Sequence, residues 1–149
     1  MNDLCLFFDG ASKGNLGQAG GGGVILSPDN SFLSSFAWGL GVDSNNKAEA
    51  MALWQGLTQA QDRGITSISV FGDSRIIIQA MSLKKYPSHL QLSRILHKIS
   101  LLSSKFQKIR YFHILRGLNS LADTEANRGV LLSRSTIMVD GRESLCNLS

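Results

Sequence analysis

Blocks of hydrophobic residues separated by short polar breaks predict three strands in the N-terminal part of the chain. The unbroken apolar run 4–8 is typical of a strand buried on both faces. Residues 21–26 and 32–38 predict two further strands, and the turn-forming residues 27–31 between them predict a hairpin. Consecutive glycines at 20–23 indicate a bulge or a close approach by another backbone. The chain is therefore expected to begin with an antiparallel β unit.

A different period follows, in which apolar residues recur every three or four positions and predict helices. The predicted helices span 46–63, 74–83, 88–105 and 119–128, and the predicted strands between them span 65–71 and 108–115. Asn46 and Asn119 are the expected N-caps of the first and last helices. Three antiparallel strands followed by strand–helix units predict an α/β fold, in which helices flank both faces of a five-stranded mixed sheet. Trp38 and Trp54 are expected in its core.

The length and composition of the chain fit one globular domain. Its 149 residues are 43% hydrophobic, which is enough for one core. We expect this domain to span 1–129, while 130–149 shows no clear period and is expected to be a C-terminal tail or linker. The two cysteines, Cys5 and Cys146, are expected to be free thiols. No run resembles a signal peptide or a membrane span, so we expect an intracellular protein with no membrane partner.

Basic residues are concentrated in the second part of the chain. The net charge is +4, and the segment from Arg63 to Arg116 contains ten Lys or Arg residues but a single acidic residue, Asp73. This distribution indicates a polyanionic partner such as a nucleic acid. A basic, solvated surface without a partner is the alternative interpretation.

Four carboxylates lie where an apolar segment meets a loop or a helix: Asp9, Glu49, Asp73 and Asp123. Taken singly, they can be explained as a turn residue, a capping-box member, a helix cap and a first-turn acid. Taken together, they suggest a site, because Asp9 and Asp73 follow strands whose carboxyl ends would meet in such a sheet. The glycine-rich stretch 10–20 after Asp9 predicts a long turn beside that site.

Clustered carboxylates suggest metal ions, because they repel one another unless cations neutralise them. Mg²⁺ prefers oxygen ligands and keeps several waters, which a few carboxylates at one rim allow. Two such ions about 4 Å apart can activate a water and stabilise the leaving oxygen of a phosphoryl displacement. The sequence contains no nucleophilic serine or cysteine motif with a partner histidine, which is consistent with metal-dependent hydrolysis.

Four motifs in series resemble those of ribonuclease H type 1. They are Phe8–Asn15, Asn45–Ala50, Phe71–Ser74 and His113–Asp123, in the family's order and spacing over about residues 4–129. The compact, archaeal-like form also found in plant retroelements is the version resembled most. Arg116, Asn119 and Asp123 match its Arg-x-x-Asn-x-x-x-Asp run. The resemblance implies a ribonuclease H-like fold whose first three strands are antiparallel.

The same resemblance implies a metal-dependent endoribonuclease that hydrolyses the RNA strand of RNA–DNA hybrids and leaves 5′-phosphate and 3′-hydroxyl ends. It implies two Mg²⁺ ions, for which Mn²⁺ can substitute. Asp9 would bridge both ions, Glu49 and Asp73 would complete one site, and Asp123 would complete the other. Duplex RNA is a weaker expected partner, and a larger reverse transcriptase polyprotein is one expected context.

Substrate contacts are also implied by the resemblance, since asparagine side chains and turn amides can bond the 2′-hydroxyl that distinguishes RNA from DNA. The implied substrate-binding residues are Gly10, Ala11, Ser12, Asn15, Ser44, Asn45, Asn46, Ser74 and Arg116. The accessory candidates are His113, Asn119, Lys84 and Lys85. For His113 two alternatives stay open, namely help with product release and a structural hydrogen bond.

Two other functions are alternatives to the ribonuclease. The first is a non-catalytic nucleic-acid-binding module of the same fold. It is disfavoured because a pure binder gains nothing from four like charges beside a phosphate backbone. The second is a related nuclease or integrase-type enzyme that acts on DNA.

Overall fold

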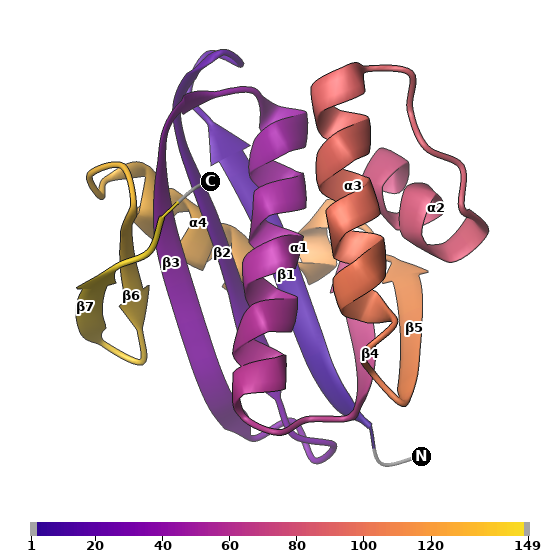
Figure 1. Cartoon of the computed structure of the whole chain (residues 1–149). Coiled ribbons are helices and arrows are strands. Elements are labelled where there is room, and N and C mark those ends of the chain that lie inside the picture. Colours follow the sequence, from indigo (N-terminus) through magenta and orange to yellow (C-terminus); the bar gives the residue numbers. More distant parts are fainter. Residues whose placement is uncertain (1–2, 148–149) are drawn as a thin grey trace.

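One mixed sheet of seven strands runs through the computed structural model, which describes residues 3–147 (Figure 1). The strand order across the sheet is β5-β4-β1-β2-β3-β6-β7. The strands are β1 (Leu4–Ser12), β2 (Gly17–Leu26), β3 (Phe32–Asp43), β4 (Ser67–Gly72), β5 (Lys108–His113), β6 (Thr136–Val139) and β7 (Arg142–Leu145). β1 pairs antiparallel with β2 and parallel with β4. The carboxyl ends of β1 and β4 therefore lie at the same edge of the sheet, as the sequence predicts.

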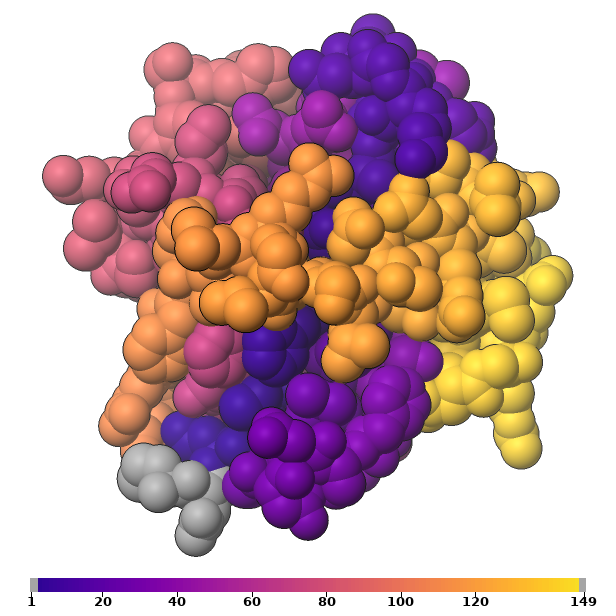
Figure 2. All heavy atoms as spheres, turned by 180° about the vertical axis from the view of Figure 1, so that it is seen from behind, coloured from indigo at the N-terminus to yellow at the C-terminus, as the bar shows by residue number. Residues whose placement is uncertain are grey.

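Helices cover both faces of this sheet, as the sequence predicts. They are α1 (Asn45–Asp62), α2 (Arg75–Leu83), α3 (Leu90–Ser103) and α4 (Ser120–Val130), with a short 3-10 turn, η1 (Arg116–Leu118). Figure 1 shows α1 and α3 side by side over one face, and Figure 2 shows the opposite face, which α4 crosses. The side chains buried between the sheet and the α1–α3 layer include Leu6, Phe8, Trp38, Leu53 and Leu96. These large apolar side chains stabilise the fold by burial.

The first residues of α1 and α4 differ from the predicted caps. Ser44, in an extended conformation, is the N-cap of α1, and its hydroxyl accepts from the Lys47 N–H at 3.2 Å. Asn46 therefore lies within the first turn of the helix. Asn119 precedes α4 as predicted, but its side chain makes no capping hydrogen bond. A cap needs a side-chain oxygen that faces the free N–H groups, and the Asn119 amide is held elsewhere.

The glycine run in β2 allows helices to pack closely on both faces of the sheet. A Cβ on Gly20 would lie 2.2 Å from the Val130 nitrogen of α4, and one on Gly22 would lie 2.3 Å from the Ala126 nitrogen. The predicted close approach by another backbone is therefore confirmed, and the register of β2 against β3 also shifts between Ala19 and Gly20. The predicted long turn is wrong, because β1 and β2 leave only residues 13–16 between them.

The prediction of five strands is wrong, because residues 130–149 add two strands to the sheet. β6 pairs antiparallel with β3, and β7 pairs with β6. Ile137 of β6 is buried in the core, and the Arg63 guanidinium binds the Asp140 carboxylate beside the hairpin. Each strand has only four residues, which is too short for a recognisable period in the sequence. The boundary at residue 129 remains a prediction, and the outer ends of the two predicted segments, 1–2 and 148–149, lie outside the described residues.

Two further observations concern the chain as a whole. Cys5 and Cys146 are free thiols, and the Cys146 sulfur accepts from the Gln55 side-chain amide at 3.4 Å. Among the described residues, no helix has the length and apolar character that crossing a membrane requires.

Candidate active site

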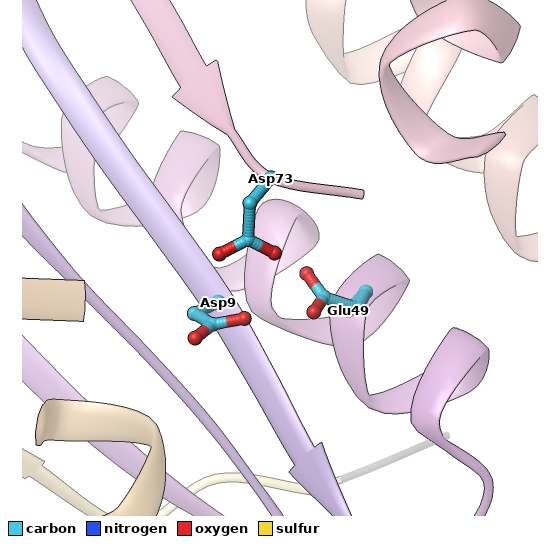
Figure 3. A group of neighbouring side chains, drawn as sticks. All are labelled: Asp9, Glu49 and Asp73. Carbon is cyan, nitrogen blue, oxygen red and sulfur yellow. The ribbon is translucent and has the colours of Figure 1, made fainter. Parts of the chain in front are cut away.

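Three carboxylates meet beside the C-terminal half of β1, although they come from separate parts of the chain. Asp9 lies in β1, Glu49 in the second turn of α1, and Asp73 directly after β4. One oxygen from each of the three lies within 4.8 Å of the others. Figure 3 shows the three side chains pointing toward a common point. The predicted convergence of these residues is therefore present in the structure.

Gly10 makes the approach of Glu49 to Asp9 possible. A Cβ at position 10 would lie 2.3 Å from the Ala48 carbonyl carbon and 2.3 Å from the Glu49 nitrogen. The first turns of α1 therefore lie directly on the β1 backbone, at the residue after Asp9. The Gly10 N–H also donates to Asp9 Oδ1 at 2.9 Å, which fixes the orientation of that carboxylate.

Asn119 holds the third carboxylate in place. Its side chain is 1% exposed, and its Nδ2 donates to the Phe8 carbonyl at 2.9 Å and to Asp73 Oδ2 at 3.1 Å. One amide group thus connects the β1 backbone beside Asp9 with the Asp73 carboxylate. The sequence placed Asn119 as a helix cap and an accessory residue, whereas the structure shows it as a support for Asp73.

Asp123, the fourth predicted carboxylate, lies in the first turn of α4 and faces the same cleft. The cleft has a volume of about 290 Å³, and its lining is mostly polar. Its lining residues are Asp9, Gly10, Ala11, Ser12, Lys13, Asn45, Asp73, Arg116, Asp123 and Asn127. Asp123 is not a member of the three-residue cluster around Asp9. Three of the four acids are therefore close together, and the fourth lines the same cleft outside that cluster.

Burial and mutual repulsion oppose the ionisation of this cluster. Burial raises the pKa of Asp9 to about 6, and the charges of Asp73 and Asp123 contribute to the rise, against the hydrogen bonds to Glu49 and Gly10. Burial also raises the pKa of Glu49 well above its usual range, with further increases from Asp9 and Asp73. A cation in the cluster would reverse both effects, because it favours the charged form of each carboxylate.

The donor set fits divalent metal ions. Glu49 is 8% exposed, and its Oε1 is fully buried without a hydrogen-bond partner among the described residues. Leaving a buried carboxylate oxygen unpaired is costly, and a metal ion would complete its coordination. All of the donors are carboxylate oxygens, which Mg²⁺ and Mn²⁺ prefer over the nitrogen and sulfur ligands of zinc sites.

The predicted substrate-binding residues other than Ser74 fall into two neighbouring groups. Gly10, Ala11, Ser12, Asn45 and Arg116 line the acidic cleft. A second depression, of about 300 Å³, begins beside Asn45 and is lined by Asn15, Ser44, Asn46, Lys47, Ile76, Pro87, Ser88, His89 and Leu92. Asn15 joins the two groups, because its Oδ1 accepts from the Asn45 N–H at 2.8 Å. Asn15 adopts a left-handed conformation, with φ of 44°, which turn asparagines tolerate.

Two predicted serines have local structural roles. The Ser44 hydroxyl accepts from the Lys47 N–H as the cap of α1, and Ser74 caps α2 by accepting from the Ile77 N–H at 3.5 Å. Ser74 rather than Asp73 is therefore the cap of α2, which leaves the Asp73 carboxylate available to the cleft. A serine hydroxyl can cap a helix and still accept a further bond, so these roles do not exclude substrate contacts.

The remaining accessory candidates differ in position. The His113 Nε2 lies 3.3 Å from the Asp73 carbonyl oxygen, which supports the structural alternative for this exposed histidine. Lys84 lies away from the cleft, beside the end of α3 and the start of β5, and Lys85 follows it in an exposed loop. The structure thus does not bring these two lysines to the acidic cleft.

Two cleft residues were missed in the sequence. Lys13 Nζ donates to Asn127 Oδ1 at 2.7 Å, which bridges the β1–β2 turn and α4 over the cleft. Lys13 lies within the first motif, and Asn127 follows Asp123 by one helical turn. The i, i+4 spacing from Asp123 is the signal that places Asn127 on the same helix face.

Solved structures with the same fold include two ribonucleases H. The crystal structure of ribonuclease H1 from the halophilic archaeon Halobacterium salinarum has a TM-score of 0.82 and 30% identity, and covers 86% of this chain and 97% of its own. The structure of LC11-RNase H1 in complex with an RNA/DNA hybrid has a TM-score of 0.81 and 26% identity, and covers 86% of this chain and 96% of its own. The fold and the acidic cleft together define a ribonuclease H-like domain.

Sequence comparisons agree with this class. The family model described as Reverse transcriptase-like matches residues 7–129, and the chain belongs to this family of ribonuclease H-like domains. The bifunctional protein Rv2228c of Mycobacterium tuberculosis is 35% identical over 120 residues, which are 80% of this chain and 33% of that protein. Ribonuclease HI of Halobacterium salinarum is 32% identical over 124 residues, which are 83% of this chain and 62% of that protein. The chain thus spans about a third of the length of the first of these relatives.

Proposed function

We propose that this chain is a metal-dependent ribonuclease H, which hydrolyses the RNA strand of RNA–DNA hybrids. The observation that carries the proposal is the convergence of Asp9, Glu49 and Asp73 within 4.8 Å, on a fold shared with ribonucleases H. A relative named ribonuclease HI, and a similar ribonuclease H1 solved with an RNA/DNA hybrid, support the substrate class. The products would carry 5′-phosphate and 3′-hydroxyl ends.

The four carboxylates would hold two divalent cations, with Mg²⁺ as the proposed ion and Mn²⁺ as a substitute. Asp9 would be shared, Glu49 and Asp73 would complete one position, and Asp123 would serve the other. When bound, such ions supply positive charge for the attacking water and for the leaving oxygen of an in-line displacement. The chain's own contribution is to hold the carboxylates in place before substrate arrives, through Gly10 and Asn119.

Recognition of the RNA strand is assigned to the rim of the cleft. Asn45 lines the acidic cleft, and Asn15, whose Oδ1 accepts from the Asn45 N–H at 2.8 Å, lines the neighbouring depression. Their amide groups can donate to and accept from a 2′-hydroxyl, which DNA lacks. The Lys13 ammonium and the Arg116 guanidinium line the same cleft and are suited to backbone phosphates.

A cleavage assay with Asp73→Asn tests the proposal. The parent protein should cut the labelled RNA strand of a hybrid in Mg²⁺ or Mn²⁺. The variant should lose cleavage and keep hybrid binding within about tenfold, since charge at the transition state is lost while substrate contacts remain. Asp62→Asn, at the exposed end of α1, is a matched control and should cut like the parent. If the parent cuts the hybrid neither in Mg²⁺ nor in Mn²⁺, the enzymatic proposal is refuted.

Substrate class needs a second set of duplexes. Matched hybrid, duplex RNA and duplex DNA should be compared under the same conditions. We expect strong cutting of the hybrid, weak cutting of duplex RNA and none of duplex DNA. A preference for duplex DNA would instead support a DNA nuclease of the same fold. Since the relatives are longer than this chain, a role within a larger polypeptide such as a reverse transcriptase is part of the proposal.

A further inference from the structure

A separate cavity of about 510 Å³ lies on the face of the molecule that α1 and α3 cover. It is bordered by β3, α1, α3 and the segment that leads from α4 to β6. Its lining residues are Leu40, Val42, Asp43, Lys47, Met51, Trp54, Ile95, Lys98 and Arg134. None of them lines the acidic cleft. The cavity is therefore distinct from the proposed catalytic centre.

The chemistry of this cavity combines an apolar floor with an excess of positive charge. Met51, Trp54 and Ile95 provide the apolar surface, and each is only half-buried. The single carboxylate, Asp43, is already paired with Lys47, whose Nζ lies 3.4 Å from Asp43 Oδ1. The cavity thus has room for a ligand with a flat apolar body, and the positive charge of its remaining cations favours an anionic group on that ligand.

Two of the cations are available for that anion. Among residues 3–147, Lys98 and Arg134 form no ion pair, and both side chains are exposed at the cavity. The stem of Arg134 lies over Gly41, where a Cβ would be 2.9 Å from the Arg134 Cδ. Gly41 has a φ of 70°, so a residue with a side chain would be strained there and would clash with the Arg134 side chain. The backbone therefore leaves space that holds the Arg134 side chain along the cavity.

We propose that this cavity is a second nucleotide site, which binds one nucleoside monophosphate unit. The base packs against Trp54 and its apolar neighbours, and the phosphate binds Lys98 and Arg134. Stacking of bases on aromatic side chains is tolerant of sequence, and guanidinium and ammonium groups suit phosphate oxygens. The volume lies in the range of small-molecule sites. Arg134 lies beyond residues 7–129, which the family model matches, so one of the two phosphate contacts comes from outside the family match.

Tryptophan fluorescence provides a direct readout of occupancy. The chain has two tryptophans, and Trp38 is 1% exposed, with its Nε1 donating to the Cys146 carbonyl at 3.3 Å. Quenching by a soluble ligand therefore reports mainly on Trp54. We expect adenosine monophosphate, added to the full chain in EDTA, to quench the emission saturably. Trp54→Phe should abolish the quenching, while calorimetry should still detect binding.

Variants of the two cations test the phosphate contact. Lys98→Gln combined with Arg134→Gln should weaken binding of adenosine monophosphate at least about tenfold, since two charge-assisted hydrogen bonds are lost. Lys84→Gln combined with Lys85→Gln removes the same charge from a different surface and should leave the affinity unchanged. Adenosine and inorganic phosphate, each with half of the ligand's chemistry, should bind at least about tenfold more weakly than the nucleotide.

Three results would overturn the proposal: no saturable binding at nucleotide concentrations on the order of 10 mM, an equal loss of affinity in both double variants, or equal affinity for inorganic phosphate and the nucleotide.

The bound nucleotide has two sources of the same chemistry, a free nucleotide and the unpaired end of a nucleic acid. Competition in EDTA separates these sources, because a hybrid with a single-stranded tail should displace adenosine monophosphate only in the second case. A blunt hybrid is the control. Asp73→Asn should retain nucleotide binding while losing cleavage, so the two proposals can fail independently.

Discussion

Asp9→Asn should stabilise the metal-free protein at neutral and alkaline pH, although it removes a proposed metal ligand. Burial raises the pKa of Asp9 from 3.8 to about 6. An unfolded chain lacks this burial, so native Asp9 holds its proton over a pH range in which the unfolded form has lost it. The group therefore stabilises the native state fully below pH 3.8, and this contribution is lost as the pH rises through about 6.

The size of the effect follows from the shift in pKa. The rise of the Asp9 pKa from 3.8 to about 6 corresponds to about 3 kcal/mol at pH 8, because a tenfold change in an equilibrium is worth about 1.4 kcal/mol. That is a large part of a typical unfolding free energy of about 5–15 kcal/mol. The substituted amide has no charge to desolvate, and its oxygen can still accept from the Gly10 N–H. Its NH₂ group can also donate toward the Glu49 carboxylate, which has a buried oxygen without a partner.

Urea unfolding in EDTA at a series of pH values measures this difference. At pH 4 the variant and the parent should have nearly equal unfolding free energies, and at pH 8 the variant should be more stable by up to about 3 kcal/mol. Asp62→Asn controls for the loss of an exposed carboxylate and should show no such pH dependence. Added Mg²⁺ should stabilise the parent by mass action and the variant much less. A parent more stable than the variant at pH 8 in EDTA would refute the reasoning.

Three further changes probe the supports of the site and the added hairpin. Gly10→Ala should lower the unfolding free energy in urea by about 1–3 kcal/mol and remove most hybrid cleavage, because its Cβ would meet the α1 backbone at 2.3 Å. Gly117→Ala, which has open space around its Cβ, is the control and should change neither stability nor cleavage. Asn119→Ala should lose about 1–3 kcal/mol and bind Mn²⁺ more weakly in calorimetry, and unchanged Mn²⁺ affinity would mean that this amide does not orient Asp73. Asp140→Ala should speed amide exchange in β6 while leaving β1 protected, because Asp140 bonds Ser34 and the Ser35 N–H of β3; equal acceleration in both strands would contradict a local role.

The neighbours of β1 and the meeting of two of the carboxylates were predictable because each depends on a strong local signal. The apolar run 4–8 is typical of a buried strand, although only Leu6 and Phe8 in it are fully buried. The antiparallel and parallel neighbours of this strand followed from short and long connections. Once β1 and β4 lie side by side, the residues that follow them, Asp9 and Asp73, must share one end of the sheet. Chain topology alone therefore brings these two acids together.

Contacts between backbones were not predictable in the same way. The glycines at 10–20 resemble a turn in composition, yet most of them lie in strands, where Gly10 admits α1 and Gly20 admits α4 against the sheet. Glycine, which has no side chain, is favoured both in turns and where two backbones pack closely. Only the three-dimensional arrangement distinguishes these two uses. Asn119 illustrates the problem for a polar residue, since its position before α4 suits a cap, whereas its amide is bound to Phe8 and Asp73.

The structure adds a physical reason why the acids of this fold need their supports. Two of the carboxylates, Asp9 and Glu49, are 4% and 8% exposed, so water screens their repulsion poorly. Without fixed positions they could separate and reduce the repulsion, which would lower the affinity for cations. Gly10, by admitting α1, and Asn119, by bonding Asp73, prevent that separation. The site therefore trades stability of the metal-free protein for a preformed set of oxygen donors, and Asp9→Asn measures how large that trade is.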